Sequence, residues 1–333
     1  MPPIPPPTVI HAPGHRPPAA AVGRVAPDRW APGQGGCVVA VGNFDGVHRG
    51  HAAIAARLCA LAGRFGVPAV TVTFDPHPAA LVRPEAAPTP LTTPARRAEL
   101  LLGLGVDAVL VQPATQELMR LPAEGFYTDI LRDRLGIRGI VEGEDFRFGA
   151  GRAGDVAMLR ELCERDGIAI ETVPPVMAAG MPVSSSRLRG LISGGDVRAA
   201  TELLTAPYRL TGTVVEGARR GGPLGFPTAN LADVTTLLPG AGVYAARAHT
   251  AGLGTHPAAV HVGPNVTFGE TRVSVEAHLI GFAGDLYGSL LDVDFLDRLR
   301  DTCRFDSVDA LRRQLATDVA RAREIVASTP PHT

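Results

Sequence analysis

An apolar strand that runs through a glycine-rich turn into a helix is the most constraining feature of this chain. Residues 38–51 have the sequence VVAVGNFDGVHRGH, and apolar residues then recur at three- and four-residue steps, which predicts a helix over 50–65. His48 and His51 therefore lie about one turn apart at the start of that helix. Because free backbone N–H groups and the positive end of the helix dipole meet there, we expect a phosphate-binding site.

The first half of the chain alternates between short apolar strands and helices. Strands are expected over 37–41, 69–74, 107–111 and 139–142, with helices over 50–65, 96–104 and 123–135. This alternation predicts an α/β fold in which helices cover both faces of a parallel sheet. Ligands of such sheets bind beyond the carboxyl ends of the strands, which is where His48, His51 and Asp75 fall.

Length and charge limit the classes of protein that fit. A chain of 333 residues predicts two domains, and a formal net charge of -1 without a basic block argues against a nucleic-acid partner. No apolar run is long enough to span a membrane and no signal peptide is recognisable, so we expect a soluble cytoplasmic protein. Residues 1–20 are rich in proline and are expected to form a disordered tail.

The chain contains no lysine, and its 32 strongly basic residues are all arginine. This excludes a Walker-type phosphate loop, the strand lysine of protein kinases and a pyridoxal Schiff base. Phosphate chemistry must then depend on arginine, histidine, backbone amides and a metal ion.

The character of the chain changes after Pro207, and we place a domain boundary near residue 206. Short strands separated by Gly and Pro suggest a closed antiparallel barrel, ending in a helix with a cap at Ser307. The strands are expected over 208–215, 241–248, 258–262, 273–280 and 289–295, and the apolar stripe of the helix consists of Val308, Leu311, Leu315, Val319, Ala322 and Val326.

Two polar motifs precede the boundary. The segment 143–149, with sequence GEDFRFG, follows the fourth strand, and Asp155 is placed to cap a helix. The serine run 184–186 leads into a helix beside Arg187 and Arg189, where hydroxyl and guanidinium groups can hold triphosphate oxygens. Taken alone, a serine run is as often a simple helix cap.

The histidine pair resembles the His-x-Gly-His signature of nucleotidyltransferases. Together with the segments TFDPHP (73–78), GEDFRFG and SSSRLR, it resembles the N-terminal half of prokaryotic bifunctional riboflavin kinase/FMN adenylyltransferase, also called FAD synthetase. The resemblance implies transition-state stabilisation by His48, His51 and Arg189. It also implies ATP or phosphate contacts at Gly42, Phe44, Asp45, Gly50, Ser184, Ser185, Ser186 and Arg187, and flavin contacts at Asp75, His77, Asp145 and Phe146.

The second half resembles riboflavin kinases. Residues 225–230 have the sequence GFPTAN, in which Thr228 and Asn230 would help to hold a magnesium-nucleotide; hydroxyl and amide oxygens suit Mg²⁺. Without the first half, a simple turn would be the better interpretation. The preceding segment 217–222 is a candidate phosphate-covering loop, and the resemblance implies ATP contacts at Gly222, Gly225, Pro227, Thr228 and Asn230.

Glu276 is the candidate base of the kinase. Val273, Val275, Ala277 and Leu279 share one face of a predicted strand, so Glu276 points to the other face and is placed to take a proton from the ribityl hydroxyl. Most glutamates on strands are merely solvated, and the resemblance is the reason for assigning a catalytic role to this one. It also implies a flavin contact at Arg300.

The expected activity is therefore FAD synthesis with ATP as co-substrate, from riboflavin through FMN, in domains 21–205 and 206–330. Any homo-oligomer is expected to be weak or transient. Departures from the family pattern at Thr205-Ala206 and Val266 leave open an FMN adenylyltransferase with a degenerate kinase domain, or a flavin-analogue substrate. The motifs also leave open a nucleotidyltransferase that uses a different acceptor, such as a phosphopantetheine-type substrate, and a non-catalytic flavin or nucleotide sensor.

Overall fold

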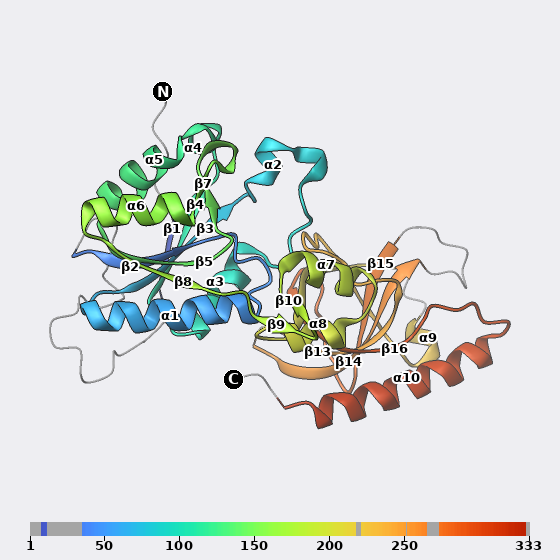
Figure 1. The fold of residues 1–333 in the computed structure, drawn as a ribbon. Coiled ribbons are helices and arrows are strands. Elements are labelled where there is room, and N and C mark those ends of the chain that lie inside the picture. The colour runs from blue at the N-terminus through green and yellow to red at the C-terminus, as the bar shows by residue number, and fades with distance from the viewer. Residues whose placement is uncertain (1–7, 12–34, 218–220, 251, 265–272, 331–333) are drawn as a thin grey trace. The chain divides into compact units, whose positions relative to one another are not determined.

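The computed structural model describes residues 8–11, 35–217, 221–250, 252–264 and 273–330. The chain forms two compact units, Met1–Ser184 and Ser185–Thr333 (Figure 1). Each unit is described by itself below.

A six-stranded sheet with the order β1-β4-β3-β2-β5-β8 forms the centre of the first unit. Strands β2, β3, β4, β5 and β8 run parallel, as the alternation of strands and helices predicts. The four expected strands are confirmed, whereas β8 is not among the strands that the sequence predicts. The strands span Thr8–His11 (β1), Cys37–Val41 (β2), Ala69–Asp75 (β3), Ala108–Pro113 (β4), Ile137–Gly143 (β5) and Ala169–Val173 (β8).

The expectation of a disordered tail over 1–20 is wrong for residues 8–11. Thr8–His11 pairs antiparallel with β4, from Thr8 opposite Val111 to His11 opposite Ala108. The segment Thr-Val-Ile-His is rich in β-branched residues, and it covers the edge of β4, so that β1 becomes the edge strand of the sheet. The remaining residues of that range lie outside the described part of the chain.

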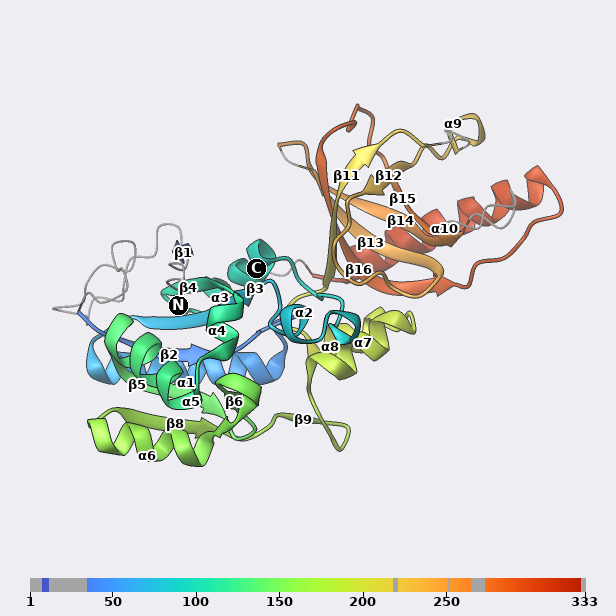
Figure 2. The ribbon, with the colours of Figure 1, turned by 90° about the horizontal axis from the view of Figure 1, so that it is seen from above.

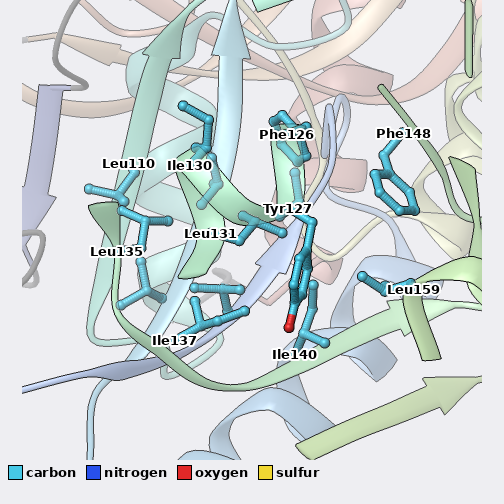
Figure 3. Packing of buried hydrophobic residues seen from close by; sticks show 14 of the residues in the cluster. Leu110, Phe126, Tyr127, Ile130, Leu131, Leu135, Ile137, Ile140, Phe148 and Leu159 are labelled. Carbon is cyan, nitrogen blue, oxygen red and sulfur yellow. The ribbon is translucent and has the colours of Figure 1, made fainter. Parts of the chain in front are cut away.

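Helices cover both faces of this sheet (Figure 1). On one face, α1 (Arg49–Phe65) and α3 (Pro94–Gly103) bury Leu58, Leu61 and Leu101 against the strands. The other face packs against α4 (Gln116–Arg120), α5 (Ala123–Gly125), η3 (Phe126–Arg134) and α6 (Val156–Asp166). Figure 3 shows the core on that side, in which Tyr127 and Leu131 are fully buried. The short elements are α2 (Ala79–Val82), η2 (Pro84–Ala86), β6 (Arg147–Phe148), η4 (Ala150–Arg152), β7 (Gly154–Asp155), β9 (Met177–Ala178) and β10 (Met181–Pro182).

The second unit contains the closed antiparallel barrel expected from the sequence, with the strand order β11-β12-β15-β14-β13-β16. Pairing of β16 with β11, from Tyr208 opposite Phe295, closes it. One strand, β12, is not among the predicted strands, because its sequence forms part of the GFPTAN motif. The elements are β11 (Tyr208–Val215), α9 (Gly221–Leu224), β12 (Ala229–Ala232), β13 (Gly242–Thr250), β14 (Gly254–Pro264), β15 (Val273–Leu279) and β16 (Leu290–Arg300).

Helix α10 (Val308–Ser328) lies along the outside of the barrel (Figure 2). Ser307 caps it as expected, with its hydroxyl accepting from the Ala310 N–H at 3.1 Å. Ala322, Val319 and Ile325 pack against Val243 and Leu299 of the barrel, so the centre of the apolar stripe is buried. Val308, the first residue of the predicted stripe, is 61% exposed.

Helices α7 (Ser185–Ser193) and α8 (Val197–Leu203) belong to the second unit. Helix α8 packs on β16 and β11 and buries Val197, Ala200 and Leu203. The division at Ser184 therefore precedes the boundary near 206 that the sequence suggests. The physical reason is the apolar face of α8, which needs the barrel strands as its partner.

Candidate functional sites

The turn between β2 and α1 is built from residues with unusual backbone conformations. Phe44, Gly46 and Val47 have φ values of 46, 85 and 37°. Gly50 follows at the first turn of the helix, where an added Cβ would lie 3.0 Å from the His48 ring. The absence of a side chain at Gly50 therefore gives the His48 imidazole its space.

His48 and His51 form a reciprocal cap at the start of α1. Nδ1 of His48 accepts from the His51 N–H at 3.4 Å, and Nδ1 of His51 accepts from the His48 N–H at 3.3 Å. The rings stack with 3.7 Å between their centroids, and Phe44 packs edge-on against His51. Because both Nδ1 atoms act as acceptors, the remaining proton of each neutral ring is on Nε2, so both residues present an Nε2–H donor.

Burial keeps this pair neutral. It lowers the pKa of His48 to about 4, although Asp45 opposes the shift. The pKa of His51 is also lowered well below its usual value, first by burial and then by the charges of His48 and Arg97. Two adjacent neutral donors at a helix N-terminus suit the oxygens of a phosphate chain.

Asp45 lies beneath this turn and has its carboxylate engaged within the fold. It accepts from the backbone N–H groups of Leu91 and Thr92 at 2.9–3.0 Å and from the Thr92 hydroxyl at 2.9 Å. Arg97 of α3 lies 3.5 Å from the carboxylate, and both side chains are buried. Asp45 therefore anchors the turn, whereas the sequence suggests that it contacts phosphate.

Arg97 and Glu142 are two buried ionisable residues for which the sequence predicts no role. Arg97 donates to Thr73 Oγ1 at 2.9 Å and to the Phe74 carbonyl at 3.2 Å, so it ties α3 to the end of β3. Glu142 accepts from the Val41 N–H at 2.7 Å, and burial raises its pKa well above the usual value. Sequence alone carries no signal for these contacts, because the partners are distant along the chain.

The predicted flavin contacts of the first unit lie at the carboxyl edge of the sheet. Asp75 is the last residue of β3 and is exposed, and His77 accepts from the Ala79 N–H at 3.1 Å. Asp145 is exposed in the turn after β5. Phe146 stacks on Phe148 with 5.5 Å between ring centroids and is partly buried. The parallel strands thus bring the ends of β2, β3 and β5 to one edge.

The serine and arginine motif straddles the division between the units. Ser184 is the last residue of the first unit, and Gly42 follows β2 within that unit. Helix α7 of the second unit carries the others, namely Ser185, Ser186, Arg187 and Arg189.

The barrel brings together three residues of the predicted kinase site. In the strand register Asn230 of β12 lies opposite Glu276 of β15. Thr228, just before β12, has its hydroxyl 3.5 Å from Glu276 Oε2, and Ser274 donates to Oε1 at 3.2 Å. Gly217 lies so close to Asn230 that a Cβ there would overlap its amide group. The sequence places Gly217 only in a loop and gives no sign of this contact.

Three other predicted kinase residues, Gly222, Gly225 and Pro227, lie in the turn that precedes β12. Gly225 has φ of 87° and donates to the Gly222 carbonyl at 3.0 Å, which forms the turn before Pro227. The Pro227 carbonyl accepts from His278 Nδ1 at 2.8 Å. Arg219 and Arg220 of the candidate loop, and Val266, lie outside the described residues.

Arg300 is held by α10. Its guanidinium donates to the buried carboxylate of Asp318 at 2.9–3.2 Å and lies 5.6 Å from the Phe305 ring. Gln314 donates to the same carboxylate at 2.8 Å. These contacts fix Arg300 between β16 and α10.

The described part of the chain lacks two features, namely membrane-spanning helices and clustered metal ligands. Within it, no helix is both long and apolar enough to cross a membrane. Nor do the described His, Cys, Asp and Glu residues form a group of three or more that could hold a metal ion. A metal ion at the Thr228 and Asn230 cluster would therefore need hydroxyl, amide and phosphate oxygens as its ligands.

The fold and the two clusters define a class of protein in which a nucleotidyltransferase-like α/β unit is joined to an antiparallel kinase barrel. Family models agree: residues 31–187 match FAD synthetase and residues 204–326 match riboflavin kinase. The bifunctional riboflavin kinase/FMN adenylyltransferase of Pseudomonas fluorescens is 40% identical over 293 residues, covering 88% of this chain and 94% of the relative. The chain belongs to the bifunctional riboflavin kinase/FMN adenylyltransferase family.

Further similar proteins match most of the length of this chain. The bifunctional riboflavin kinase/FMN adenylyltransferase of Escherichia coli K12 is 35% identical over 298 residues, covering 90% of this chain and 95% of the relative. A crystal structure described as a macrolide-efflux protein from Streptococcus pneumoniae has a TM-score of 0.78 and 30% identity, and covers 90% of this chain and 98% of that one. The similarity thus extends across both units.

Proposed function

We propose that this chain makes FAD from riboflavin in two ATP-dependent steps. The barrel phosphorylates riboflavin to FMN, and the α/β unit transfers an adenylyl group to FMN with release of pyrophosphate. The observation that carries the proposal is the convergence of Thr228, Asn230 and Glu276 in one barrel, on a chain that also carries the His48 and His51 pair. The two clusters lie in different halves of the sequence.

In the adenylyl step an oxygen of the FMN phosphate attacks the α-phosphorus of ATP, and the bond to the leaving pyrophosphate breaks. The Nε2–H groups of His48 and His51, left as donors by the reciprocal cap, are proposed to donate to phosphate oxygens as negative charge develops. Arg189 and the hydroxyls of Ser184, Ser185 and Ser186 are proposed to align the triphosphate, with Arg187 beside them. Asp45 acts indirectly, by fixing the turn that carries Gly42, Phe44 and Gly50.

In the kinase step Glu276 accepts the proton of the ribityl 5′-hydroxyl. The hydroxyl oxygen forms a bond to the γ-phosphorus, and the bond to the leaving ADP breaks. Ser274 holds Oε1 of the carboxylate at 3.2 Å, which leaves the other oxygen on the side of Thr228. The turn through Gly222, Gly225 and Pro227 is proposed to contact ATP.

The residues present fit a magnesium ion in the barrel. Thr228 and Asn230 supply a hydroxyl and an amide oxygen beside the Glu276 carboxylate, and such hard oxygen donors suit Mg²⁺ bound to ATP. When bound, the ion neutralises phosphate charge. Arg300, fixed by Asp318, is proposed to border the flavin, and flavin contacts in the other unit are assigned to Asp75, His77, Asp145 and Phe146.

We further propose that the protein is cytoplasmic and that its functional domains are 21–205 and 206–330. Helices α7 and α8 precede residue 206 in the sequence but belong to the second compact unit. The phosphate-binding motif on α7 belongs to the adenylyltransferase by its role, although this helix packs with the second unit. Any homo-oligomer is proposed to be weak or transient, and no nucleic-acid partner is expected.

The deciding experiment incubates purified protein with riboflavin, ATP and magnesium and separates the flavins by chromatography. FMN should appear first and FAD should follow. FAD formed only from added FMN would instead support an adenylyltransferase with a degenerate kinase, and no product from either flavin would support a sensor.

A further inference from the structure

A row of side chains crosses the face of the barrel that α10 covers. Residues paired in an antiparallel register share a face, and the pairs here join Asn230 to Glu276, Glu276 to His261, His261 to Val243 and Val243 to Arg300. Val243 belongs to the apolar cluster that packs against α10. His261 of β14 therefore lies between the carboxylate of the proposed base and an apolar side chain.

One ring nitrogen of His261 is buried without a partner. Among the described residues, no hydrogen-bonding group reaches its Nδ1 atom. An unsatisfied buried polar atom destabilises the folded chain, so such an atom calls for an explanation in terms of function. The neighbours across the ladder are Glu276 on one side and Val243 on the other, and only Glu276 can accept a hydrogen bond through its side chain.

The charges around His261 favour a neutral ring. Burial lowers its pKa, Glu276 acts in the opposite direction, and Arg300 adds to the lowering. Arg300 faces it from β16 and is itself paired with Asp318 of α10. A neutral imidazole carries one N–H group, which either ring nitrogen can bear.

The carboxylate of Glu276 accepts hydrogen bonds from hydroxyl groups on neighbouring residues. Ser274 donates to Oε1 at 3.2 Å, whereas the Thr228 hydroxyl is 3.5 Å from Oε2, at the outer limit of a hydrogen bond. A carboxylate has about four acceptor positions. A base that must meet a substrate hydroxyl has to be held to within about 0.5 Å, so every donor that orients its carboxylate matters.

We propose that His261 is a positioning residue of the kinase site, whose Nδ1–H donates to the Glu276 carboxylate and fixes its orientation toward the ribityl hydroxyl. The proposal rests on the riboflavin kinase activity proposed above. In the proposed arrangement the ring turns so that Nδ1 faces the neighbouring strand, where the Cβ atoms of such paired residues lie about 5 Å apart. His261 itself touches neither the phosphate nor the hydroxyl.

Three substitutions test which atom matters. His261→Asn places an amide nitrogen near the position of Nδ1, His261→Gln extends a donor to the position of Nε2, and His261→Leu has neither. Riboflavin phosphorylation by the full-length protein should lose about tenfold in kcat with Leu and with Gln, with the KM for riboflavin and for ATP unchanged within about twofold. Asn should restore most of the loss. FAD formation from added FMN serves as the internal control and should remain at the wild-type rate in all three.

A double-mutant cycle with Glu276→Gln separates positioning from packing. Without the carboxylate, His261→Leu should have no further effect on residual kcat. The inference is overturned if Leu raises KM at constant kcat, if Asn and Gln behave alike, or if the Leu effect persists in full in the Glu276→Gln background. If that residual rate is too low to measure, or if the Leu variant does not fold, the comparison of Asn with Gln decides. A wild-type protein that makes no FMN would instead refute the kinase activity itself.

Discussion

The backbone N–H of His48 donates to the ring of His51, and the backbone N–H of His51 donates to the ring of His48. One pair of residues thus caps α1 and presents two Nε2–H donors at the same place. The cap and the phosphate-binding donors are the same side chains, so a substitution has to be chosen to separate the two roles.

His51→Ala should reduce FAD formation from FMN by a factor on the order of 10² or more, the scale seen when one preorganised donor is lost. Riboflavin phosphorylation should continue at the wild-type rate, because Glu276 lies in the other unit. Chromatography of both products in one reaction measures the two rates together. Loss of both activities would contradict the assignment, because it would show that the substitution disturbs the whole chain and not the adenylyl step alone.

Acid should destabilise the first unit through His48. Its pKa is about 4 in the folded chain, below the usual 6.5 of an unfolded histidine, so the unfolded chain binds more protons between these values. The contribution of His48 to the free energy of unfolding is therefore fully present above pH 6.5 and decreases as the pH falls toward 4. Between pH 7.5 and pH 5 the loss due to His48 should be about 2 kcal/mol, at 1.36 kcal/mol per unit of pH.

Urea unfolding at these two pH values, with and without His48→Asn, measures that contribution. Asparagine is a good N-cap and does not titrate, so the variant should lose less stability than the wild type between pH 7.5 and pH 5. An equal loss in both proteins would exclude His48 as the titrating group.

Asp45→Asn should destabilise the first unit by about 3 kcal/mol or more, because it leaves the buried guanidinium of Arg97 without its counter-charge. The double variant Asp45→Asn/Arg97→Leu removes the buried charge of Arg97 as well and should recover part of the lost free energy of unfolding. Thermal unfolding of the three proteins gives the order. If Asp45→Asn instead leaves stability unchanged and raises only the KM for ATP, Asp45 contacts phosphate directly.

The two architectures and the main polar clusters can be predicted from the sequence because their signals are local. The histidine pair follows a strand and opens a helix, and the alternation at Val273 to Leu279 places Glu276 on the polar face, as the register shows. The buried pair of Asp45 and Arg97 joins residues that no local pattern relates. The same holds for β1, whose pairing with β4 depends on a sheet edge that forms elsewhere.

Glu276→Gln should lower FMN production by a factor on the order of 10²–10⁴, since the amide retains the shape of the side chain but cannot accept the proton. Riboflavin binding should persist, as measured by quenching of flavin fluorescence. In the same protein, FAD synthesis from added FMN should stay within about twofold of the wild type. A parallel loss of FAD synthesis would contradict the assignment of the two steps to separate units.

A fragment that starts at Ser185 should be more stable than one that starts near Ala206, although both contain the whole barrel. Helix α8 buries Val197, Ala200 and Leu203, and the Ile192 carbonyl at the end of α7 accepts from the Gly240 N–H at 2.9 Å. Removing these helices exposes the barrel surface that they cover, at a cost of a few kcal/mol. Urea midpoints of fragments 185–330 and 206–330 measure the difference.

Both fragments, where folded, should phosphorylate riboflavin, because Thr228, Asn230, Glu276 and Arg300 lie after residue 206. Equal midpoints would show that α7 and α8 contribute nothing to the barrel and would favour a boundary near 206. A fragment 185–330 that folds and binds flavin but makes no FMN would have a different meaning. The departures at Thr205-Ala206 and Val266 would then mark a degenerate kinase, and adenylyl transfer to FMN would be the only activity left to the chain.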